Sequence, residues 1–368
     1  MAPWSHQAVG REDSVARREH RVVDIAAQAG LSRATVDRVL HGREGVRPET
    51  VAQVNRAIDE LGRQREQVHL SGRTIILDLV MQTPERFAVA ARAALEAELR
   101  SLRPAVLRAR SQLSEHSDPA AAAALLDAVG RRGSHGVILK APDHPLVVDA
   151  VQRLAARGIP TVTFVTDVPG SRRVAYVGMD NAAAGATAAY LVTRWAGPSG
   201  GVLLTVSHSS FRGEEERDLG FRRTLAELAP QRTVYEVKDT DGLDRTILVA
   251  VRRELALHPS IDAVYSPGGG NVATLTAFEE IGVTPAVYVA HDLDGDNRAL
   301  LRTGRISVVL HHDLRADMQR ACLLLLQARG LMPGTPTSVP SQVQVVTPYN
   351  EPAFLMPEAG SAGGRRWS

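Results

Sequence analysis

The sequence predicts two domains: an all-α helix-turn-helix domain at residues 21–62, and a two-lobed α/β domain with parallel sheets at residues 74–350. Three short amphipathic segments, each closed by a glycine-containing turn, predict the helical domain. From residue 74 onward, β-branched apolar runs alternate with alanine- and leucine-rich helical segments, which favours parallel sheets covered on both faces. About ten such strands are many for one open sheet, so two lobes are expected.

The helical domain contains three helices. The first carries apolar residues three or four positions apart and ends at Gly30. Ser32 is a good N-cap for the second helix, Arg33–Leu40. The third is expected to run from Pro48 to Leu61 and to end at Gly62. Because a short glycine-containing turn joins the first two helices, the unit has the form of a helix-turn-helix.

The α/β domain is expected to contain strands and helices in alternation. The predicted strands are at residues 74–80, 105–107, 136–139, 160–165, 174–177, 201–206, 233–237, 263–265 and 286–290. The predicted helices are at residues 87–102, 118–131, 144–157, 181–195, 214–228, 244–257 and 272–281. Residues 63–73 form a hinge or linker, while residues 1–20 and the C-terminal tail, residues 351–368, have the polar or glycine-rich composition of disordered segments.

Composition excludes several classes of protein. The longest apolar stretches fall far short of the roughly 20 residues that a membrane helix needs, and the N-terminus lacks the apolar run of a signal peptide. The single cysteine excludes an intrachain disulfide and a cysteine-rich zinc module. These features predict a cytoplasmic location. A net charge of +2 says nothing by itself about a nucleic-acid partner.

The second helix of a helix-turn-helix enters the DNA major groove, and its N-terminal residues reach the base edges. Here those positions are Ser32, Arg33, Ala34 and Thr35, with Arg38 one turn further on. Arginine can donate two hydrogen bonds to guanine, whereas serine and threonine suit phosphate or base edges. A small helical bundle with an arginine-bearing surface is the alternative interpretation of an isolated triplet of helices.

A family resemblance resolves that choice. The sequence from Val23 to Arg43, VDIAAQAGLSRATVDRVLHGR, together with Val46-Arg-Pro-Glu-Thr-Val51, resembles the DNA-binding head of LacI/GalR repressors. Two residues depart from that pattern: Asp37 replaces the usual serine and His41 the usual asparagine. The resemblance implies a repressor that binds double-stranded, pseudo-palindromic operator DNA as a homodimer, with His41 among the DNA-contacting residues.

The segment after the head is less regular. Members of the family continue with a short hinge helix whose leucine inserts into the minor groove, and Leu70 is the candidate for that role here. The segment is a few residues short and lacks proline. A plain solvated linker is therefore an equally good interpretation of residues 63–73.

The α/β domain also resembles the effector domain of the same family, a type I periplasmic-binding-protein-like fold. The motifs that carry this resemblance are Tyr176–Gly185, Arg217–Phe221, Gly268–Asn271, His291–Asp294 and the run around His312. In that fold a ligand lies between two lobes and is contacted by loops at strand ends. The resemblance implies a small carbohydrate or polyol as effector.

By position, Arg217, Asn271 and Asp292 match the ligand-contacting Arg, Asn and Asp of the family. An arginine, an amide and a carboxylate suit a polyol, because donors and acceptors then alternate around neighbouring hydroxyls. Inter-lobe ion pairs or helix caps are the alternative roles.

Three further residues are candidate effector contacts: His312 by alignment with the family, Asp167 at a strand end, and Phe87 as a stacking face. A satisfied turn, a cap and a core position are their respective alternatives.

Two other functions stay open. A solute-binding transport protein would share the two-lobed fold, and a sugar-modifying α/β enzyme would share its strand–helix alternation. Gly268-x-Gly270-x-x-Ala273 also fits a loose dinucleotide fingerprint, with Asp292 near its acidic position. No catalytic constellation and no metal-ligand pair of the H-E-x-x-H kind stands out. We therefore expect a DNA-binding regulator that is not an enzyme and needs no cofactor or metal.

Overall fold

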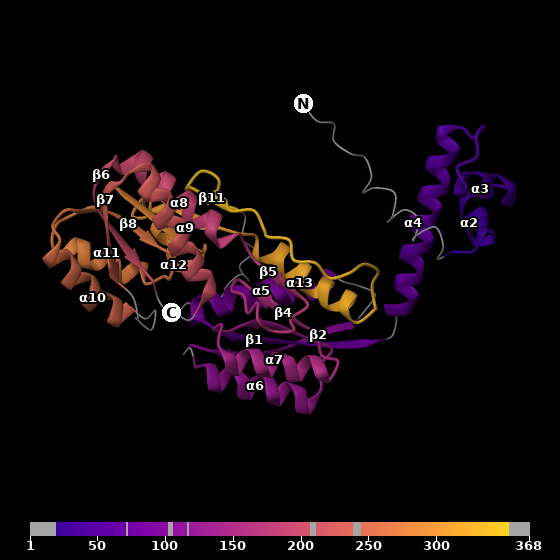
Figure 1. Ribbon diagram of the computed structural model, residues 1–368, viewed down its shortest axis with the longest axis horizontal. Helices are drawn as coiled ribbons and strands as arrows, with labels where there is room; N and C mark the ends of the chain where they lie inside the picture. Colours follow the sequence, from indigo (N-terminus) through magenta and orange to yellow (C-terminus); the bar gives the residue numbers. More distant parts are fainter. Residues whose placement is uncertain are drawn as a thin grey trace, which may run out of the picture. The chain divides into compact units, whose positions relative to one another are not determined.

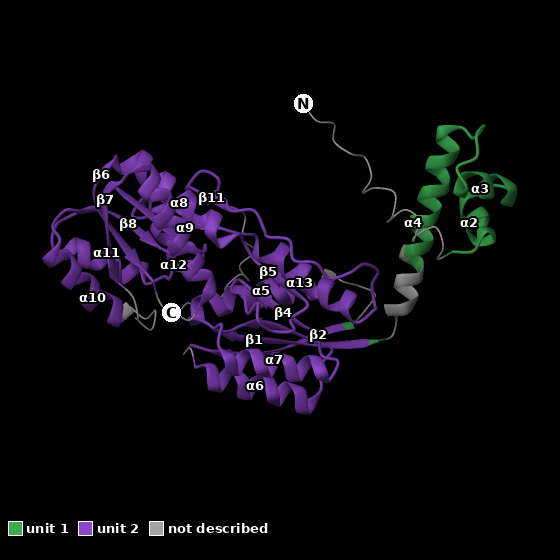
Figure 2. Cartoon of the chain, viewed as in Figure 1, with its two compact units in different colours: residues 1–73, 103–106 green, residues 74–102, 107–368 purple. Residues whose placement is uncertain are grey.

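The computed structural model describes residues 20–70, 73–101, 106–115, 118–206, 211–237 and 244–352. The chain divides into two compact units (Figure 2): the first is residues 1–73 with 103–106, and the second is residues 74–102 with 107–368. The predicted N-terminal extension, except for His20, and most of the predicted C-terminal tail lie outside the described residues.

The first unit contains helices α2, Val22–Ala29, and α3, Arg33–Leu40, packed against the longer α4. Gly30 adopts a left-handed conformation, with φ of 63°, and so ends α2 where the sequence predicts. Ser32 caps α3 because its Oγ accepts a hydrogen bond of 3.1 Å from the Thr35 amide. The core of this unit is small and aliphatic, with Ile25, Val36 and Val54 fully buried.

Helix α4 differs from the sequence prediction, because it runs without a break from Pro48 to Leu70 (Figure 1). Gly62 lies inside the helix instead of ending it. A single helical glycine costs only about 1 kcal/mol relative to alanine, and the residues that follow it are good helix formers without proline. The side chain of Gln64 also donates to Glu60 one turn earlier. The predicted linker is therefore helical as far as Leu70, whose side chain lies outside the described part.

The second unit has two lobes, each built on one sheet. The sheet of the first lobe has the order β2-β1-β3-β4-β5, and β1–β3, β3–β4 and β4–β5 are parallel pairs. Its strands are β1 Thr74–Gln82, β2 Val106–Ser114, β3 Gly136–Lys140, β4 Thr161–Phe164 and β5 Ala175–Val177. Helices α6 and α7 cover one face and α5 and α13 the other (Figure 1). These helices are α5 Glu85–Ser101, α6 Pro119–Arg132, α7 Pro145–Ala156 and α13 Leu314–Ala328.

The sheet of the second lobe has the order β11-β10-β9-β8-β6-β7, in which only β11 is antiparallel to its neighbour. Its strands are β6 Ser199–Thr205, β7 Gln231–Val237, β8 Ile261–Ser266, β9 Val287–His291, β10 Val308–His311 and β11 Gln344–Val346. Its helices are α8 Asn181–Ala196, α9 Arg212–Leu228, α10 Asp244–Leu257, α11 Asn271–Glu280 and α12 Gly295–Arg302. One apolar cluster joins the sheet to α10, α11 and α12, and another joins its other face to α8 and α9.

The chain passes between the lobes three times: from β5 to α8, from β10 to α13, and from α13 to β11. Helix α13 follows a strand of the second lobe but packs on α5 and β4 of the first. The first and third crossings run side by side, because the Tyr176 amide donates to Ser338 and Met179 pairs with Ser341. The carboxyl ends of strands from both lobes therefore meet around one region. Among the described residues, no helix is long and apolar enough to cross a membrane.

Candidate functional site

A partly open cavity lies between the lobes of the second unit, with about 660 Å³ of empty space when the solvent at its mouth is included. Its walls are residues at or just beyond the carboxyl ends of β1, β3, β4, β8 and β9, together with the first turns of α5 and α9. Open α/β sheets bind ligands at this edge.

The side chain of Arg217 extends from α9 to the cavity, and the residue is only 3% exposed. Its Nε donates to Asn181 Oδ1 over 2.8 Å, and its Nη1 donates to the Pro267 carbonyl over 3.2 Å. Nη1 also lies 3.9 Å from Asp292 Oδ2, whereas Nη2 is buried and has no hydrogen-bond partner in the part of the chain that the structure describes. Hydrogen bonds therefore fix Nε and Nη1 of the guanidinium, and Nη2 remains a donor for a ligand.

Two glycines set the depth of Arg217 by allowing α8 and α9 to pack closely. A Cβ at Gly185 would lie 1.9 Å from the Arg217 carbonyl oxygen, and one at Gly220 would lie 2.2 Å from the Ala182 carbonyl oxygen. No larger residue fits either position without separating the helices. These contacts give a physical reason for the glycines in the Tyr176–Gly185 and Arg217–Phe221 motifs.

Asp292 follows β9 with φ of 64°, in the left-handed region that non-glycine residues seldom adopt. Among the described residues, the other non-glycine position of this kind is Val165, at 66°, and both line the cavity. Such conformations cost about 1–3 kcal/mol and are found at binding sites. Asn297 holds the loop, because its Nδ2 donates to the carbonyl oxygens of His291 and Asp292.

His312 has a fully buried side chain behind Asp292. Its Nδ1 donates to the Asp317 carboxylate, which fixes the orientation of the ring. Nε2 lies 3.8 Å from Asp292 Oδ1, and neither atom has a hydrogen-bond partner within the described structure. A carboxylate oxygen and a ring nitrogen thus face one another next to Nη2 of Arg217.

Asn271 lies behind the cavity wall. Its Nδ2 donates to Asn297 Oδ1 over 2.6 Å, and its Oδ1 accepts from the Tyr288 hydroxyl over 2.9 Å. The cavity-lining residue is thus Asn297, which sequence reasoning missed, and Asn271 supports it. The only sequence signal for Asn297 is its place three residues after Asp294, whose carboxylate caps α12 by accepting from the Asn297 amide.

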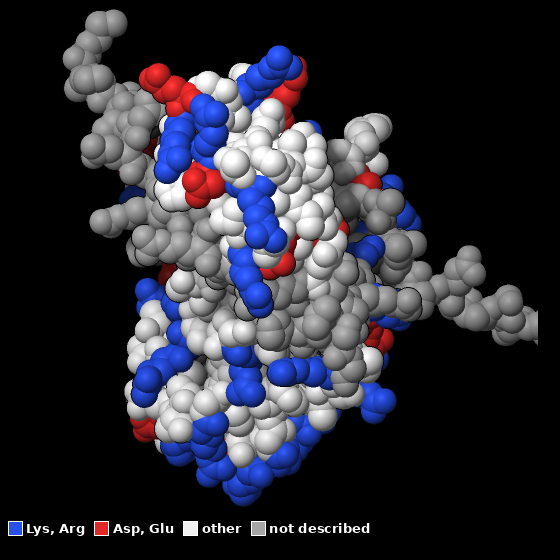
Figure 3. Space-filling view, turned by 90° about the vertical axis from the view of Figure 1, so that its right-hand side faces the viewer, with Lys and Arg blue, Asp and Glu red and all other residues white. Residues whose placement is uncertain are grey.

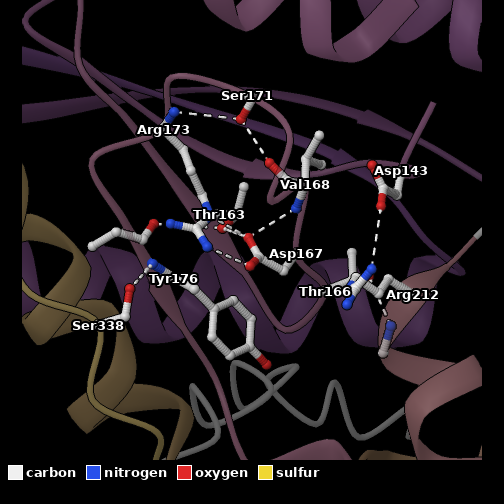
Figure 4. A network of polar contacts seen from close by, with 12 residues as sticks. Asp143, Thr163, Thr166, Asp167, Val168, Ser171, Arg173, Tyr176, Arg212 and Ser338 are labelled. Carbon is white, nitrogen blue, oxygen red and sulfur yellow. Dashed lines mark hydrogen bonds and ion pairs between the residues drawn. The ribbon is translucent and has the colours of Figure 1, made fainter. Parts of the chain in front are cut away.

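Asp167 is also outside the cavity lining, although its neighbour Thr166 is part of it. Both of its carboxylate oxygens bind Arg173, and it also accepts from Thr163 Oγ1 and the Val168 amide (Figure 4). With these partners its acceptor capacity is used within the loop between β4 and β5. Of the three further candidates, Phe87 lies in the cavity wall, and His312 lies just behind it.

Lys140 is a cavity residue that sequence reasoning missed, and it is 8% exposed at the end of β3. Its Nζ lies 4.1 Å from the ring centroid of Phe211 and 6.0 Å from that of Phe87, and it donates to the Gln82 carbonyl over 3.3 Å. Burial lowers the pKa of Lys140 to about 8. Lys140 is one of only two lysines among 43 lysine and arginine residues, and this rarity is the sequence feature that could have singled it out.

Two charged residues join the lobes at the cavity. Arg86 on α5 lies 3.1 Å from the carboxylate of Asp294, measured from Nε to Oδ2. Burial raises the pKa of Asp294 to about 6, against the opposing effects of its hydrogen bond to the Asn297 amide and of Arg86. His291 also lines the cavity, and burial holds its pKa well below the ordinary value. Neutral His291 shares a hydrogen bond of 2.9 Å with the Tyr265 hydroxyl.

In the first unit, the predicted DNA contacts lie together at the start of α3 and along its outer face. Arg33, Ala34 and Arg38 are exposed, and the Ser32 and Thr35 hydroxyls share a hydrogen bond of 2.8 Å. Arg38 Nη2 donates to the Glu44 carbonyl, so this guanidinium rests on the loop before α4.

Exposed His41 lies at the end of α3, and its Nδ1 is 2.8 Å from the Asp37 carbonyl oxygen. Across the described residues, no group of three or more His, Cys, Asp or Glu side chains could hold a metal ion.

Comparisons with known proteins match both units. Residues 22–65 match the family of bacterial regulatory proteins called the lacI family, and residues 79–328 match the periplasmic binding protein domain. The transcriptional regulators reg1 of Streptomyces lividans and MalR of Streptomyces coelicolor are each 29% identical to the chain, over 268 and 267 residues. Each match covers 69% of this chain and 67% of the relative.

Solved structures share the fold of the second unit. A solute-binding protein of an ABC transporter from Burkholderia graminis, in complex with D-arabinose, has a TM-score of 0.70 at 20% identity, over 77% of this chain and 98% of its own. The glucose-galactose binding protein GanP of Geobacillus stearothermophilus has a TM-score of 0.68 at 16% identity, over 76% and 99%.

A helix-turn-helix unit followed by a two-lobed binding domain defines a DNA-binding transcriptional regulator with a periplasmic-binding-protein-like sensor domain. The chain belongs to the periplasmic binding protein domain family, and its first unit matches the lacI family of bacterial regulatory proteins. The fold class predicted from the sequence is thereby confirmed.

Proposed function

We propose that the protein is a cytoplasmic, homodimeric repressor whose affinity for operator DNA is controlled by a small neutral carbohydrate or polyol in the cavity. One observation carries the proposal: Arg217 Nη2, Asp292 Oδ1 and His312 Nε2 are buried polar atoms that have no hydrogen-bond partner among the described residues, and they gather at one end of the cavity. Unpartnered buried polar groups cost about 1–3 kcal/mol each, so a ligand that pairs with them gains that energy.

The chemistry of these atoms matches adjacent hydroxyl groups. Arg217 Nη2 is a donor and Asp292 Oδ1 is an acceptor, whereas His312 Nε2 accepts in a neutral ring and donates in a protonated one. A hydroxyl donates one hydrogen bond and accepts another, so neighbouring hydroxyls on a sugar ring satisfy all three atoms. A purely accepting group such as a carboxylate would leave Asp292 unpaired.

Charge around the cavity favours a neutral ligand. The lining contains three basic side chains and three carboxylates: Arg86, Lys140, Arg217, Glu214, Asp292 and Asp294. A phosphorylated or acidic sugar would bring a negative charge without a matching excess of positive charge. The rings of Phe87 and Phe211 supply an apolar surface for the C–H face of a sugar.

The same arrangement supports regulation. Phe87 and Lys140 belong to the first lobe, whereas Arg217 and Asp292 belong to the second. A ligand that contacts both lobes favours one lobe angle over others, and the energy of that preference is what shifts the DNA-binding equilibrium. One helix-turn-helix per protomer makes a two-fold dimer on a pseudo-palindromic site the expected binding mode. The sugar-binding proteins of similar fold are consistent with this ligand class.

A thermal-unfolding screen of the full chain tests the ligand class. The panel contains aldopentoses, aldohexoses, disaccharides and polyols, each beside its phosphate or acid where one exists. We expect at least one neutral compound to raise the Tm, since a ligand at about 100-fold its Kd adds about 2.7 kcal/mol to stability. Stabilisation by phosphorylated or acidic sugars alone would contradict the neutral-ligand proposal. Conversion of the bound sugar would favour the enzyme alternative.

A further inference from the structure

One face of the second unit carries arginine side chains with very few carboxylates among them. This arginine face lies where the helices of the first lobe end. Figure 3 shows Lys and Arg side chains spread over the lower part of the molecule. It consists of residues from β2 and from the ends of α6, α7 and α13: Arg108, Arg110, Arg131, Arg132, Arg157 and Arg329. All six are exposed or half-buried.

Hydrogen bonds place these side chains together. Arg157 Nη1 donates to the Gly130 carbonyl near the end of α6, and Arg329 Nη1 donates to the Gly158 carbonyl just after α7. Arg110 Nη2 donates to the Gly133 carbonyl. Arg108 lies two residues before Arg110 on β2, so it projects from the same side of the strand.

Carboxylates neutralise only part of this face. Arg110 and Arg132 share the single buried carboxylate of Asp78. Arg153 forms an ion pair with nearby Asp127, and the charges of Arg131 and Arg157 further lower the pKa of that carboxyl.

Within the described structure, the remaining four arginines of the face form no ion pair. Helix C-termini carry a partial negative charge of about half a unit each, so the three helices offset roughly one and a half charges. More than three positive charges per protomer therefore stay uncompensated.

We propose that the arginine face binds the phosphate backbone of the same duplex that the first unit holds. The proposal rests on DNA binding by that unit, in which only Ser71, Gly72 and Arg73 separate α4 from the start of the second unit at Thr74. The charges are spread over the ends of several elements and do not converge on one pocket. A row of evenly spaced phosphates matches such a distribution, whereas a single small anion does not.

The tether strengthens this argument. Once the helix-turn-helix is on DNA, the arginine face meets duplex at a high effective concentration, because only two residues separate α4 from Arg73. Contacts that are too weak to hold DNA alone then add to the affinity. They add no sequence preference, since phosphates carry no base information.

The experiment compares three forms of the full chain on one duplex, selected by the parent protein from a randomised pool. The forms are the parent, a triple variant with Arg131→Gln, Arg157→Gln and Arg329→Gln, and the same triple with Lys in place of Gln. Log Kd is measured against log salt concentration. Each lost phosphate contact changes that slope by about 0.9, so we expect the Gln triple to lose between two and three units per protomer. The Lys triple should keep most of the parent slope because it keeps the charge.

A matched control removes three exposed arginines from other positions, Arg172→Gln, Arg223→Gln and Arg253→Gln, and should change the slope by less than one unit. Thermal unfolding checks that every variant is folded. A Gln triple with the slope of the parent, or one that behaves like the control, would overturn the proposal while leaving DNA binding by the first unit intact. Failure of the parent itself to bind any selected duplex would instead contradict the proposed function.

Discussion

Lys140 is a charged side chain buried at the end of a strand, and replacing it should stabilise the protein. Its pKa of about 8 in the folded state, against an ordinary value of 10.5, corresponds to a cost of about 3 kcal/mol at neutral pH. We expect Lys140→Met to raise the free energy of unfolding at pH 7 by about 1–3 kcal/mol. This gain is smaller than the full cost of the buried charge because the hydrogen bond to the Gln82 carbonyl is lost. Denaturant titration measures the change.

The pH dependence of the same variant has a definite sign. Below pH 8 both the folded and the unfolded states hold the Lys140 proton, so the full cost of the buried charge is present. Between pH 8 and 10.5 the unfolded state holds more protons, so the stability of the parent rises with pH. The advantage of Lys140→Met should therefore shrink as the pH rises through this range. An advantage that is constant from pH 7 to 10 would contradict the buried-charge explanation.

Asp292 and Asp167 form a natural pair of test and control. Both are carboxylates after strands, yet Asp292 has an unpartnered oxygen at the cavity whereas Asp167 is fully engaged by Arg173 and its neighbours. We expect Asp292→Asn to weaken binding of the stabilising sugar at least tenfold, and Asp167→Asn to leave it within about twofold. Isothermal titration calorimetry gives both values. Equal losses in the two variants would remove Asp292 from the binding site.

Single residues also show what sequence could and could not predict. Arg217 and Asp292 were identified because a family motif marks them, and the structure places both in the cavity wall. Lys140 and Asn297 belong to no motif and reach the cavity only through packing of distant segments. Asp167 matched the pattern of a strand-end carboxylate, but the sequence alone does not show that Arg173 forms an ion pair with it.

At the scale of elements, most strands and helices follow hydrophobic periodicity. The strands β10 and β11 and the helices α12 and α13 were not among the predicted elements, for physical reasons. Strands β10 and β11 are only four and three residues long and give a weak periodic signal, although β4 and β5 are equally short and were predicted. Helix α12 is only eight residues long, and α13 packs on the lobe that does not contain the strand before it.

Helix α4 gives a prediction at this scale because Gly62 lies inside it. A Cβ at Gly62 would meet only His20 Nε2, at 3.9 Å, and Gly62 lies inside α4 without a positive φ. We expect Gly62→Ala to stabilise α4 by about 0.5–1 kcal/mol, since alanine has less backbone entropy to lose. Slower hydrogen exchange of the α4 amides would report this change.

Gly30 supplies the matched control for that variant. It also has open space around its Cβ position, but its φ is +63°. Gly30→Ala should destabilise the first unit, because alanine is strained in the left-handed region. If both alanine variants change exchange in the same direction, Gly62 is not an ordinary helical residue, and the continuous helix is contradicted.

For the whole molecule, the proposed function links a cavity in one unit to DNA binding by the other. We propose that a sugar that pairs with Arg217, Asp292 and His312 while touching the first lobe stabilises one arrangement of the lobes. In a dimer, that preference alters how the two helix-turn-helix units are presented to the half-sites. The coupling is reciprocal, so DNA must change sugar affinity by the same factor as sugar changes DNA affinity.

The most direct test is the Kd of the full chain for its selected duplex, measured with and without the neutral sugar that gives the largest rise in Tm. We expect saturating sugar to change that Kd by about 5- to 150-fold, the usual range of allosteric coupling, and Asp292→Asn to abolish the change while still binding the duplex. An unchanged Kd in the parent, with calorimetry showing that the sugar is bound in the cavity, would contradict the central claim that this site controls DNA binding.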